Sequence, residues 1–224
     1  MPDQSGPPDS VGILVPTGML GGGFSQETIT RGLRLGADVI AVDGGSTDSG
    51  PYYLGAGVAK TADRAVRRDL RLLLAAASSA RIPLIVGSCG TSGTDSGVNW
   101  VAGIVHAICA EDGLDLTVAK IFSEQHAGQL IAQLERGRIH ALPPSEPLDA
   151  ATPLDAATLL RCAHIVAMMG HEPIEQALRA GADVVLAGRA TDTAVSAAFA
   201  LMRGMPPGPA WHAAKRLTLP RLVT

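Results

Sequence analysis

Val39-Ile40-Ala41-Val42 is an apolar run that leads directly into the loop Asp43-Gly44-Gly45-Ser46-Thr47-Asp48-Ser49-Gly50. A short apolar run bounded by turn residues predicts a buried strand, with the loop at its carboxyl end. The order of apolar run, polar loop and helix recurs along the chain, and the runs are apolar throughout instead of alternating. This pattern is typical of a mostly parallel sheet with helices on both faces, a doubly wound, Rossmann-like α/β fold. About six strands are predicted, at residues 11–16, 38–42, 84–87, 116–122, 165–169 and 184–187.

The chain is predicted to form one domain with irregular ends. A disordered, proline-containing lead-in is predicted for residues 1–10, a single α/β domain for 11–204 and an irregular tail for 205–224, where four prolines occur. Another proline-rich connection, residues 138–153, is predicted to lie on the surface, with a lid as one interpretation. Helices are predicted at residues 26–35, 61–80, 98–110, 128–136, 155–161, 174–180 and 194–202.

The composition excludes several classes of protein. With 224 residues, 46% of them hydrophobic, the chain is long enough to bury a core, but no apolar run approaches the roughly 20 residues that span a bilayer. The net charge of -3 is dispersed, which argues against nucleic acid and membranes as partners. The three cysteines have no metal-binding spacing and there is no secretory signal, so the sequence predicts a cytoplasmic location and no bound metal.

Polar side chains gather in the loops that follow the predicted strands. The carboxyl ends of parallel strands share one edge of a sheet, where ligands bind, so these loops are expected to converge. Carboxylates and imidazoles there can act as acids and bases, and two carboxylates can also hold a cation. Each residue has a structural alternative, because a loop Asp caps turns and a lone His is more often structural. The candidate catalytic residues are Asp43, Asp48, Glu124 and His171.

Side chains able to bind a substrate occupy the same loops. Tyr52 and Tyr53 are the only tyrosines of the chain, and they can donate to an oxyanion or stack on an apolar ligand, or one can pack beneath the loop. Arg189 suits a carboxylate or phosphate, and an ion pair with Asp192 that supports the loop is the alternative. The candidate substrate-binding residues are Ser46, Thr47, Tyr52, Tyr53, Ser88, Cys89, Thr91, Ser92, Arg189, Thr191 and Asp192.

A glycine-rich loop follows the first predicted strand. Strand, glycines and helix together bring free backbone N–H groups and the positive end of a helix to one place, which suits an anion. The spacing matches neither a dinucleotide fingerprint nor a P-loop, and a tight turn against the sheet is the alternative interpretation. No motif specifies a cofactor, and a nucleotide at this loop is one hypothesis. The candidate anion-binding residues are Gly21, Gly22, Gly23 and Ser25.

Two segments of the chain echo each other. Gly36-Ala37-Asp38-Val39 and Gly181-Ala182-Asp183-Val184 each join a helix to a strand, and each strand is followed by a Thr-Asp pair. Such connections are common in α/β proteins, so the echo does not indicate a duplication. It predicts that Asp48 and Asp192 occupy comparable places above the sheet, with the site between them.

Four loops of the chain form a recognisable set. They are Asp43-Gly44-Gly45-Ser46-Thr47-Asp48-Ser49-Gly50-Pro51-Tyr52-Tyr53-Leu54-Gly55, Gly87-Ser88-Cys89-Gly90-Thr91-Ser92-Gly93, Ser123-Glu124-Gln125 and Gly188-Arg189-Ala190-Thr191-Asp192-Thr193. Together they resemble the acyclic terpene utilisation (AtuA-like) family of bacterial proteins, over about residues 11–215. The resemblance implies cytoplasmic small-molecule metabolism, linked to catabolism of acyclic terpenoids through CoA thioesters, and it carries no established catalytic residues. Members of the family are commonly longer, so the chain is expected to cover the N-terminal part of that length.

These observations lead to two hypotheses of different kinds. The first is a small-molecule metabolic enzyme that acts on a carboxylate or CoA-thioester substrate, of the lyase, hydratase or hydrolase type, with acid/base chemistry. The second is a non-catalytic binding or assembly subunit whose site is completed by another chain. The expected partners are a small-molecule substrate and either further copies of the chain, in a homo-oligomer, or a second subunit.

Overall fold

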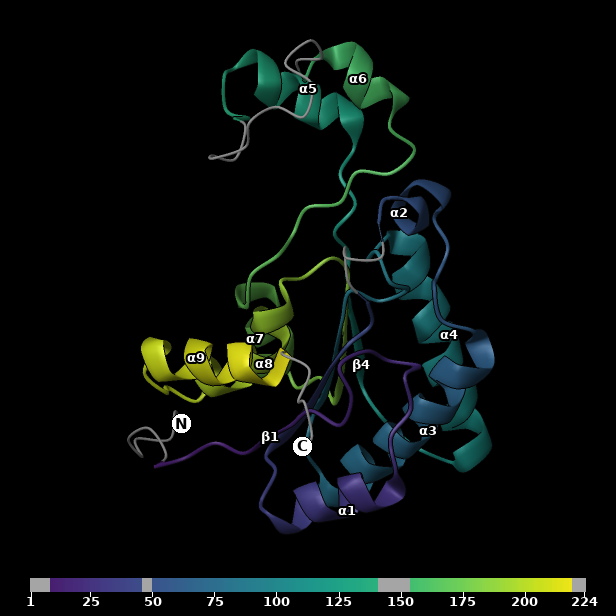
Figure 1. Ribbon diagram of the computed structural model, residues 1–224, viewed down its shortest axis with the longest axis vertical. Helices are drawn as coiled ribbons and strands as arrows, with labels where there is room; N and C mark the ends of the chain where they lie inside the picture. The colour runs from purple at the N-terminus through teal and green to yellow at the C-terminus, as the bar shows by residue number, and fades with distance from the viewer. Residues whose placement is uncertain (1–8, 46–49, 141–153, 219–224) are drawn as a thin grey trace.

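A computed structural model of the protein describes residues 9–45, 50–140 and 154–218, and these residues contain a five-stranded parallel sheet (Figure 1). The strands lie in the order β1-β2-β3-β5-β4, and every pairing between neighbours is parallel. The predicted parallel α/β fold is confirmed, with five strands in place of about six. The strands are β1 (Ile13–Leu14), β2 (Val39–Asp43), β3 (Leu84–Gly87), β4 (Val118–Ile121) and β5 (Val184–Ala187).

Both faces of the sheet are covered, which explains why its central strands are apolar throughout. Successive side chains of a strand point to opposite faces. Ile40 and Val42 of β2 belong to a buried cluster with Leu70, whereas Val39 lies in a second cluster with Phe199. The first face is covered by α1 (Gln26–Arg34), α3 (Asp63–Ala80) and α4 (Asp95–Asp112), and the second by α7 (Glu172–Arg179) and α8 (Asp192–Met202).

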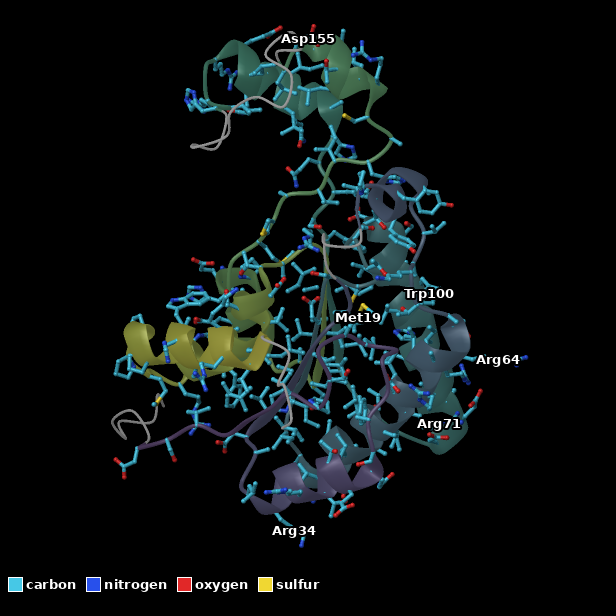
Figure 2. All side chains as sticks on the ribbon, viewed as in Figure 1. Met19, Arg34, Arg64, Arg71, Trp100 and Asp155 are labelled. Atoms are coloured by element: carbon cyan, nitrogen blue, oxygen red, sulfur yellow. The ribbon has the colours of Figure 1, made fainter. Side chains whose placement is uncertain are left out.

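The helix α3 shows how the sequence pattern sets the layers. Leu70, Leu73 and Leu74 recur at helical spacing and are fully buried against the sheet. The arginines lie on the other side, where Figure 2 shows Arg64 and Arg71 pointing outward. Arg71 also forms ion pairs with acidic residues at the end of α4, so part of this arginine face joins two helices.

The helices that follow two neighbouring strands lie on opposite faces of the sheet. β3 and β5 pair with each other, but β3 leads into α4 and β5 leads into α8. The chain therefore leaves these two strands toward opposite faces of the sheet, and in parallel α/β proteins ligands bind at the carboxyl ends of strands related in this way. The loop after β2 lies beside the loop after β3, because β2 pairs with β3.

The segment 165–169, predicted to be a strand, is not one. Val166 forms a single antiparallel bridge to Glu124, and Met169 forms a single parallel bridge to Ala190. Both bridges lie beyond the ends of β4 and β5, so the segment crosses the edge of the sheet instead of joining it. Met168 is 59% exposed, because this crossing leaves its side chain without a covering layer.

The tail, predicted to be irregular, contains the helix α9 (Pro207–Thr218). Pro207 and Pro209 lie in its first turn, where the missing proline N–H has no intrahelical partner to lose, so these prolines begin the helix instead of preventing it. Ala210 and Ala214 are buried, and α9 packs along α8. The helix therefore adds a further layer on that face of the sheet.

Two helices stand away from the sheet, at the top of Figure 1. They are α5 (Ala127–Glu135) and α6 (Ala156–Arg161), which pack on each other and which we call the arm. Leu159 is the one residue of the two arm helices that is buried in the described structure. Residues 141–153 of the predicted surface connection lie outside the described residues. Among the described helices, none is both long and apolar enough to cross a membrane.

Candidate functional site

The loops after β2 and β3 touch through their backbones. The N–H of Gly44 donates to the carbonyl oxygen of Gly87 (2.6 Å). At Gly45 a Cβ atom would lie 2.2 Å from the Cα of Thr91, so only glycine permits this approach. The two loops thus form one unit at the carboxyl edge of the sheet.

The loop after β3 contains two residues in an unusual backbone conformation. Ser88 has a φ of 44° and Thr91 a φ of 76°, in the left-handed region that L-residues with side chains rarely adopt. Ser88 and Thr91 are both buried, and the Thr91 hydroxyl accepts from the N–H of Lys60 (2.9 Å). Backbone strain of this kind concentrates at functional sites, where surrounding contacts hold it in place.

Asp43, the last residue of β2, is a carboxyl group that titrates near neutrality. Burial raises its pKa from 3.8 to about 7, and the negative charge of Asp192 adds to this effect. The Gly45 N–H (3.1 Å from Oδ1), the Arg189 guanidinium and the Ser88 hydroxyl act in the opposite direction. Because Asp43 gains and loses its proton near pH 7, it can serve as either an acid or a base.

Arg189, in the loop after β5, is a buried cation with hydrogen-bond donors that no described residue uses. The residue is only 5% exposed, and neither Nε nor Nη1 has a hydrogen-bond partner among residues 9–45, 50–140 and 154–218. Its backbone N–H donates to the hydroxyl of Ser123 (2.7 Å), which in turn donates to the carbonyl oxygen of Gly93 (2.8 Å). The loops after β3, β4 and β5 are thereby joined around this residue.

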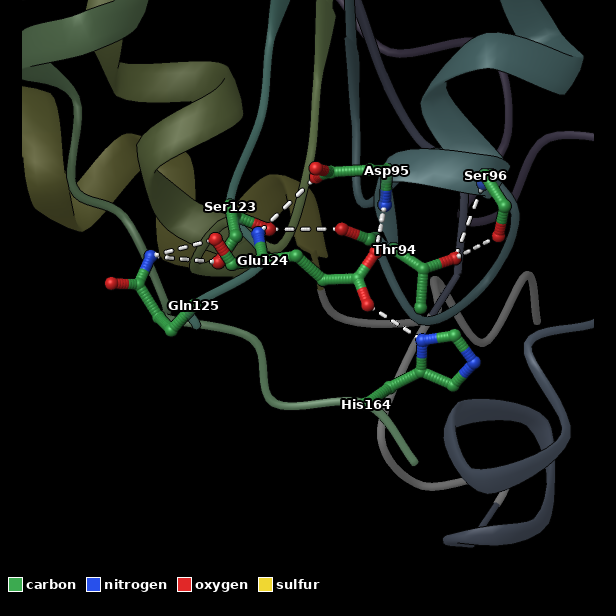
Figure 3. Close-up of polar contacts among 9 residues, drawn as sticks. Thr94, Asp95, Ser96, Ser123, Glu124, Gln125 and His164 are labelled. Carbon is green, nitrogen blue, oxygen red and sulfur yellow. Dashed lines mark hydrogen bonds and ion pairs between the residues drawn. The ribbon is translucent and has the colours of Figure 1, made fainter. Parts of the chain in front are cut away.

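Glu124, in the loop after β4, is held from two sides (Figure 3). Its Oε2 accepts from the N–H of Asp95 (2.8 Å), and its own N–H donates to Asp95 Oδ1 (3.2 Å). Its Oε1 lies 2.6 Å from Nδ1 of His164. Partial burial acts to raise the pKa of Glu124, but the bonds from His164 and Asp95 outweigh it and lower the pKa. Glu124 is therefore an ionised carboxylate with both oxygens engaged.

His171 and the tyrosines lie apart from this group. His171 begins α7, with its ring 5.3 Å from that of Trp211 in α9 and its Nε2 3.3 Å from Glu175. Tyr52 and Tyr53 begin a short helix that the sequence did not predict, α2 (Tyr52–Ala56), and their rings pack edge to face. Tyr52 is 70% exposed. No described contact brings these residues to Asp43 or Arg189.

Several of the remaining candidates have structural roles. Cys89 is fully buried in the core and its burial raises the pKa of the thiol, and a contact between Cys89 and a substrate stays a prediction. The Thr191 side chain caps α8 by accepting from the N–H of Ala194 (3.2 Å). Ser92, by contrast, is buried with a hydroxyl that has no hydrogen-bond partner. Ser46, Thr47 and Asp48 lie outside the described residues.

The glycine-rich loop binds an anion that belongs to the chain itself. Oδ2 of Asp69, a fully buried residue of α3, accepts from the N–H groups of Gly21 (2.8 Å) and Gly23 (3.1 Å). Oδ1 accepts from Nε of Arg68 (2.8 Å). An internal carboxylate therefore occupies these donors, and binding of an external anion at this loop stays a prediction. Ser25 caps α1 by accepting from the N–H of Thr28 (3.2 Å).

Three residues of this arrangement were absent from the sequence prediction: Asp69, Asp95 and His164. Asp69 could have been found, because it lies beside Leu70 on the apolar face of a long helix, where a carboxylate needs a partner. Asp95 follows the capping Thr94 and had no distinguishing signal. His164 is 40 residues from its partner Glu124, a separation that no local pattern reveals. In the described ranges, no three His, Cys, Asp or Glu side chains gather closely enough to hold a metal ion.

Fold and loops together define a parallel α/β protein whose polar loops converge at the carboxyl edge of its sheet. The chain matches the acyclic terpene utilisation family protein AtuA over residues 56–203, which is more than half of its 224 residues. It therefore belongs to the AtuA family, as the resemblance of its loops implies, and membership suggests a role in acyclic terpene utilisation. The match includes the loops after β3, β4 and β5 but begins after the loop that follows β2. Neither the comparison with curated proteins nor that with solved structures finds a match.

Proposed function

We propose that this protein is an enzyme that binds a small carboxylate, or its CoA thioester, at the carboxyl edge of the sheet and transfers a proton there during acyclic terpenoid catabolism. One observation carries the proposal: a buried guanidinium with unused donors, Arg189, lies near a carboxyl group that titrates near neutrality, Asp43. Lyases, hydratases and hydrolases all move protons to or from a substrate, and such transfer is most efficient when the pKa of the acid or base lies near the operating pH.

The binding role follows from the energetics of Arg189. A buried guanidinium N–H group without an acceptor is costly, and ligand oxygens that accept from Nε or from Nη1 would remove part of that cost. The planar guanidinium suits a carboxylate, and a charge-assisted hydrogen bond of this kind is stronger than a neutral one. In the neighbouring loop, the hydroxyl of Ser92 also has no hydrogen-bond partner in the described part of the chain.

Arg189→Met tests this role. Citronellate, an acyclic terpenoid carboxylate, and its CoA thioester are expected to bind the wild-type protein and raise its Tm. The variant should bind at least about tenfold more weakly, because a hydrogen bond to a charged group contributes about 1.5 to 3 kcal/mol. Its Tm without ligand should not fall, because the substitution removes a buried charge that has no hydrogen bonds at Nε or Nη1. Calorimetric titration and thermal unfolding measure the two effects.

Arg64→Met is the matched control for this experiment, since Arg64 is exposed and points away from the sheet (Figure 2). It should bind both ligands like the wild type. Unchanged binding by a folded Arg189→Met variant would contradict the proposed role of Arg189. Failure of both ligands to bind the wild type would contradict the proposed function.

The arm favours a second candidate function, that of a subunit completed by another chain. Leu160 of α6 is 69% exposed, and Leu154, which precedes this helix, is 47% exposed. Among the described elements, the arm helices contact no other helix or strand extensively. Such an apolar surface is typical of an interaction site. Light scattering of the purified chain is expected to show a dimer or larger assembly in that case. A monomer that turns over substrate would exclude this candidate.

A further inference from the structure

The segment that returns from the arm to α7 brings an imidazole to the edge of the sheet. His164 lies in this segment, and its Nδ1 is 2.6 Å from Oε1 of Glu124 (Figure 3). Glu124 in turn is held by Asp95 at the first turn of α4. The adjacent Ser123 accepts from the backbone N–H of Arg189, so the pair is joined to the proposed anion site through one residue.

The carboxylate determines which imidazole nitrogen holds the proton. The bonds from His164 and Asp95 keep Glu124 ionised, and the ring of His126 in the same loop acts in the same direction. An ionised carboxylate at Nδ1 requires a proton on that nitrogen, so in the neutral ring Nε2 has the lone pair. This is how an orienting carboxylate selects the tautomer of a histidine base.

The second nitrogen lies beside Gly57 and has no hydrogen-bond partner among the described residues. A Cβ atom on Gly57, which ends α2 with a φ of 63°, would lie only 2.7 Å from Nε2, so only glycine permits this close approach. The side chain of His164 is 26% exposed. The nitrogen that has the lone pair can therefore accept a hydrogen bond or a proton from a ligand.

We propose that His164 is a proton-transferring residue of this site, with Nε2 as the accepting atom and Glu124 as the residue that positions it. The inference rests on the proposed function. In the step, a C–H or O–H bond of the bound substrate or of water breaks as the N–H bond at Nε2 forms. The positive imidazolium is stabilised by Glu124. The proton then passes to the product or to solvent, which restores the neutral ring.

Nuclear magnetic resonance of the 15N-labelled full chain tests the first half of the inference, without any ligand. Neutral His164, assigned by its loss in His164→Gln, is expected to be the tautomer protonated at Nδ1. Glu124→Gln should reduce the fraction of this tautomer. A ring protonated at Nε2 in the wild type would overturn the inference.

Exchange of the α-protons of citronellyl-CoA with deuterium from D2O tests the second half. His164→Gln is expected to slow this exchange at least about 100-fold, the usual contribution of a positioned base, while Kd for the thioester changes less than about threefold. His106→Gln, which alters an exposed histidine of α4, should leave both values unchanged. Binding without exchange in the wild type, or exchange that His164→Gln does not slow, would overturn the inference and leave the proposed binding intact. Failure of the thioester to bind would instead count against the proposed function.

Discussion

Asp43→Asn is expected to remove a large part of the pH dependence of stability between pH 4 and pH 7. Burial raises the pKa of Asp43 to about 7 in the folded chain, against 3.8 for the free carboxyl, so the folded protein holds a proton in this window that the unfolded chain has released. The contribution of this group to stability is therefore complete below pH 3.8 and is lost as the pH rises through about 7. Each pH unit in the window lowers the free energy of unfolding by up to about 1.4 kcal/mol, or about 4 kcal/mol in all.

Urea unfolding at pH 4, 6 and 8 measures this effect. The free energy of unfolding of the wild type should fall relative to that of Asp43→Asn as the pH rises, and the variant should be the more stable protein at pH 8, because its amide has no charge to bury. Asp115→Asn alters an exposed carboxylate and should keep the wild-type slope. Identical slopes for Asp43→Asn and the wild type would show that Asp43 does not titrate in this window.

Asp69→Ala is expected to lower the free energy of unfolding by about 3 kcal/mol, because it removes the acceptor of two loop N–H groups and of a guanidinium. The loop between β1 and α1 would lose the contact that holds it against α3. Leu20, which precedes these glycines, is fully buried and donates its N–H to the carbonyl oxygen of Asp43 (2.7 Å). The loss should therefore also loosen the end of β2.

Asp63→Ala is the control for Asp69→Ala, because Asp63 lies on the same helix and is exposed. It should change stability by less than about 1 kcal/mol, the usual size of a helix-end charge effect. Denaturant unfolding at pH 7 compares the two variants. Equal, small effects would show that water replaces the Asp69 carboxylate at the glycine loop.

Apolar runs predict the fold where both faces of a strand are covered. The strands at 84–87 and 184–187 have the predicted bounds, because each is an uninterrupted apolar run between turn residues. The run 165–169 has the same composition but forms only isolated bridges, and composition alone does not say whether a run has strands beside it. The prolines of residues 205–224 indicated an irregular tail where a helix forms, because the effect of a proline depends on whether it falls in the first turn of a helix or inside it.

The sequence predicts which loops meet but not which side chains pair within them. Asp43, Glu124 and Arg189 lie at the carboxyl edge because that edge is a property of parallel strands. The partner of each residue comes from elsewhere in the chain: Asp192 acts on Asp43 and His164 binds Glu124. Such pairs depend on side-chain geometry after folding, which the spacing of residues along the chain does not encode.

The arm gives the protein an uneven distribution of local stability. Helix α8, which begins two residues after Ala190, has seven buried residues between the sheet and α9, whereas the arm helices bury one. Segments with few buried contacts unfold locally at a small fraction of the free energy needed for the whole domain. Arg189 thus lies next to α8, one of the segments expected to unfold last. His164 lies in the segment that leads back from the arm, which is expected to unfold first. The arm could therefore detach the imidazole while the guanidinium stays in place, so that release of a bound molecule would not require the sheet to move.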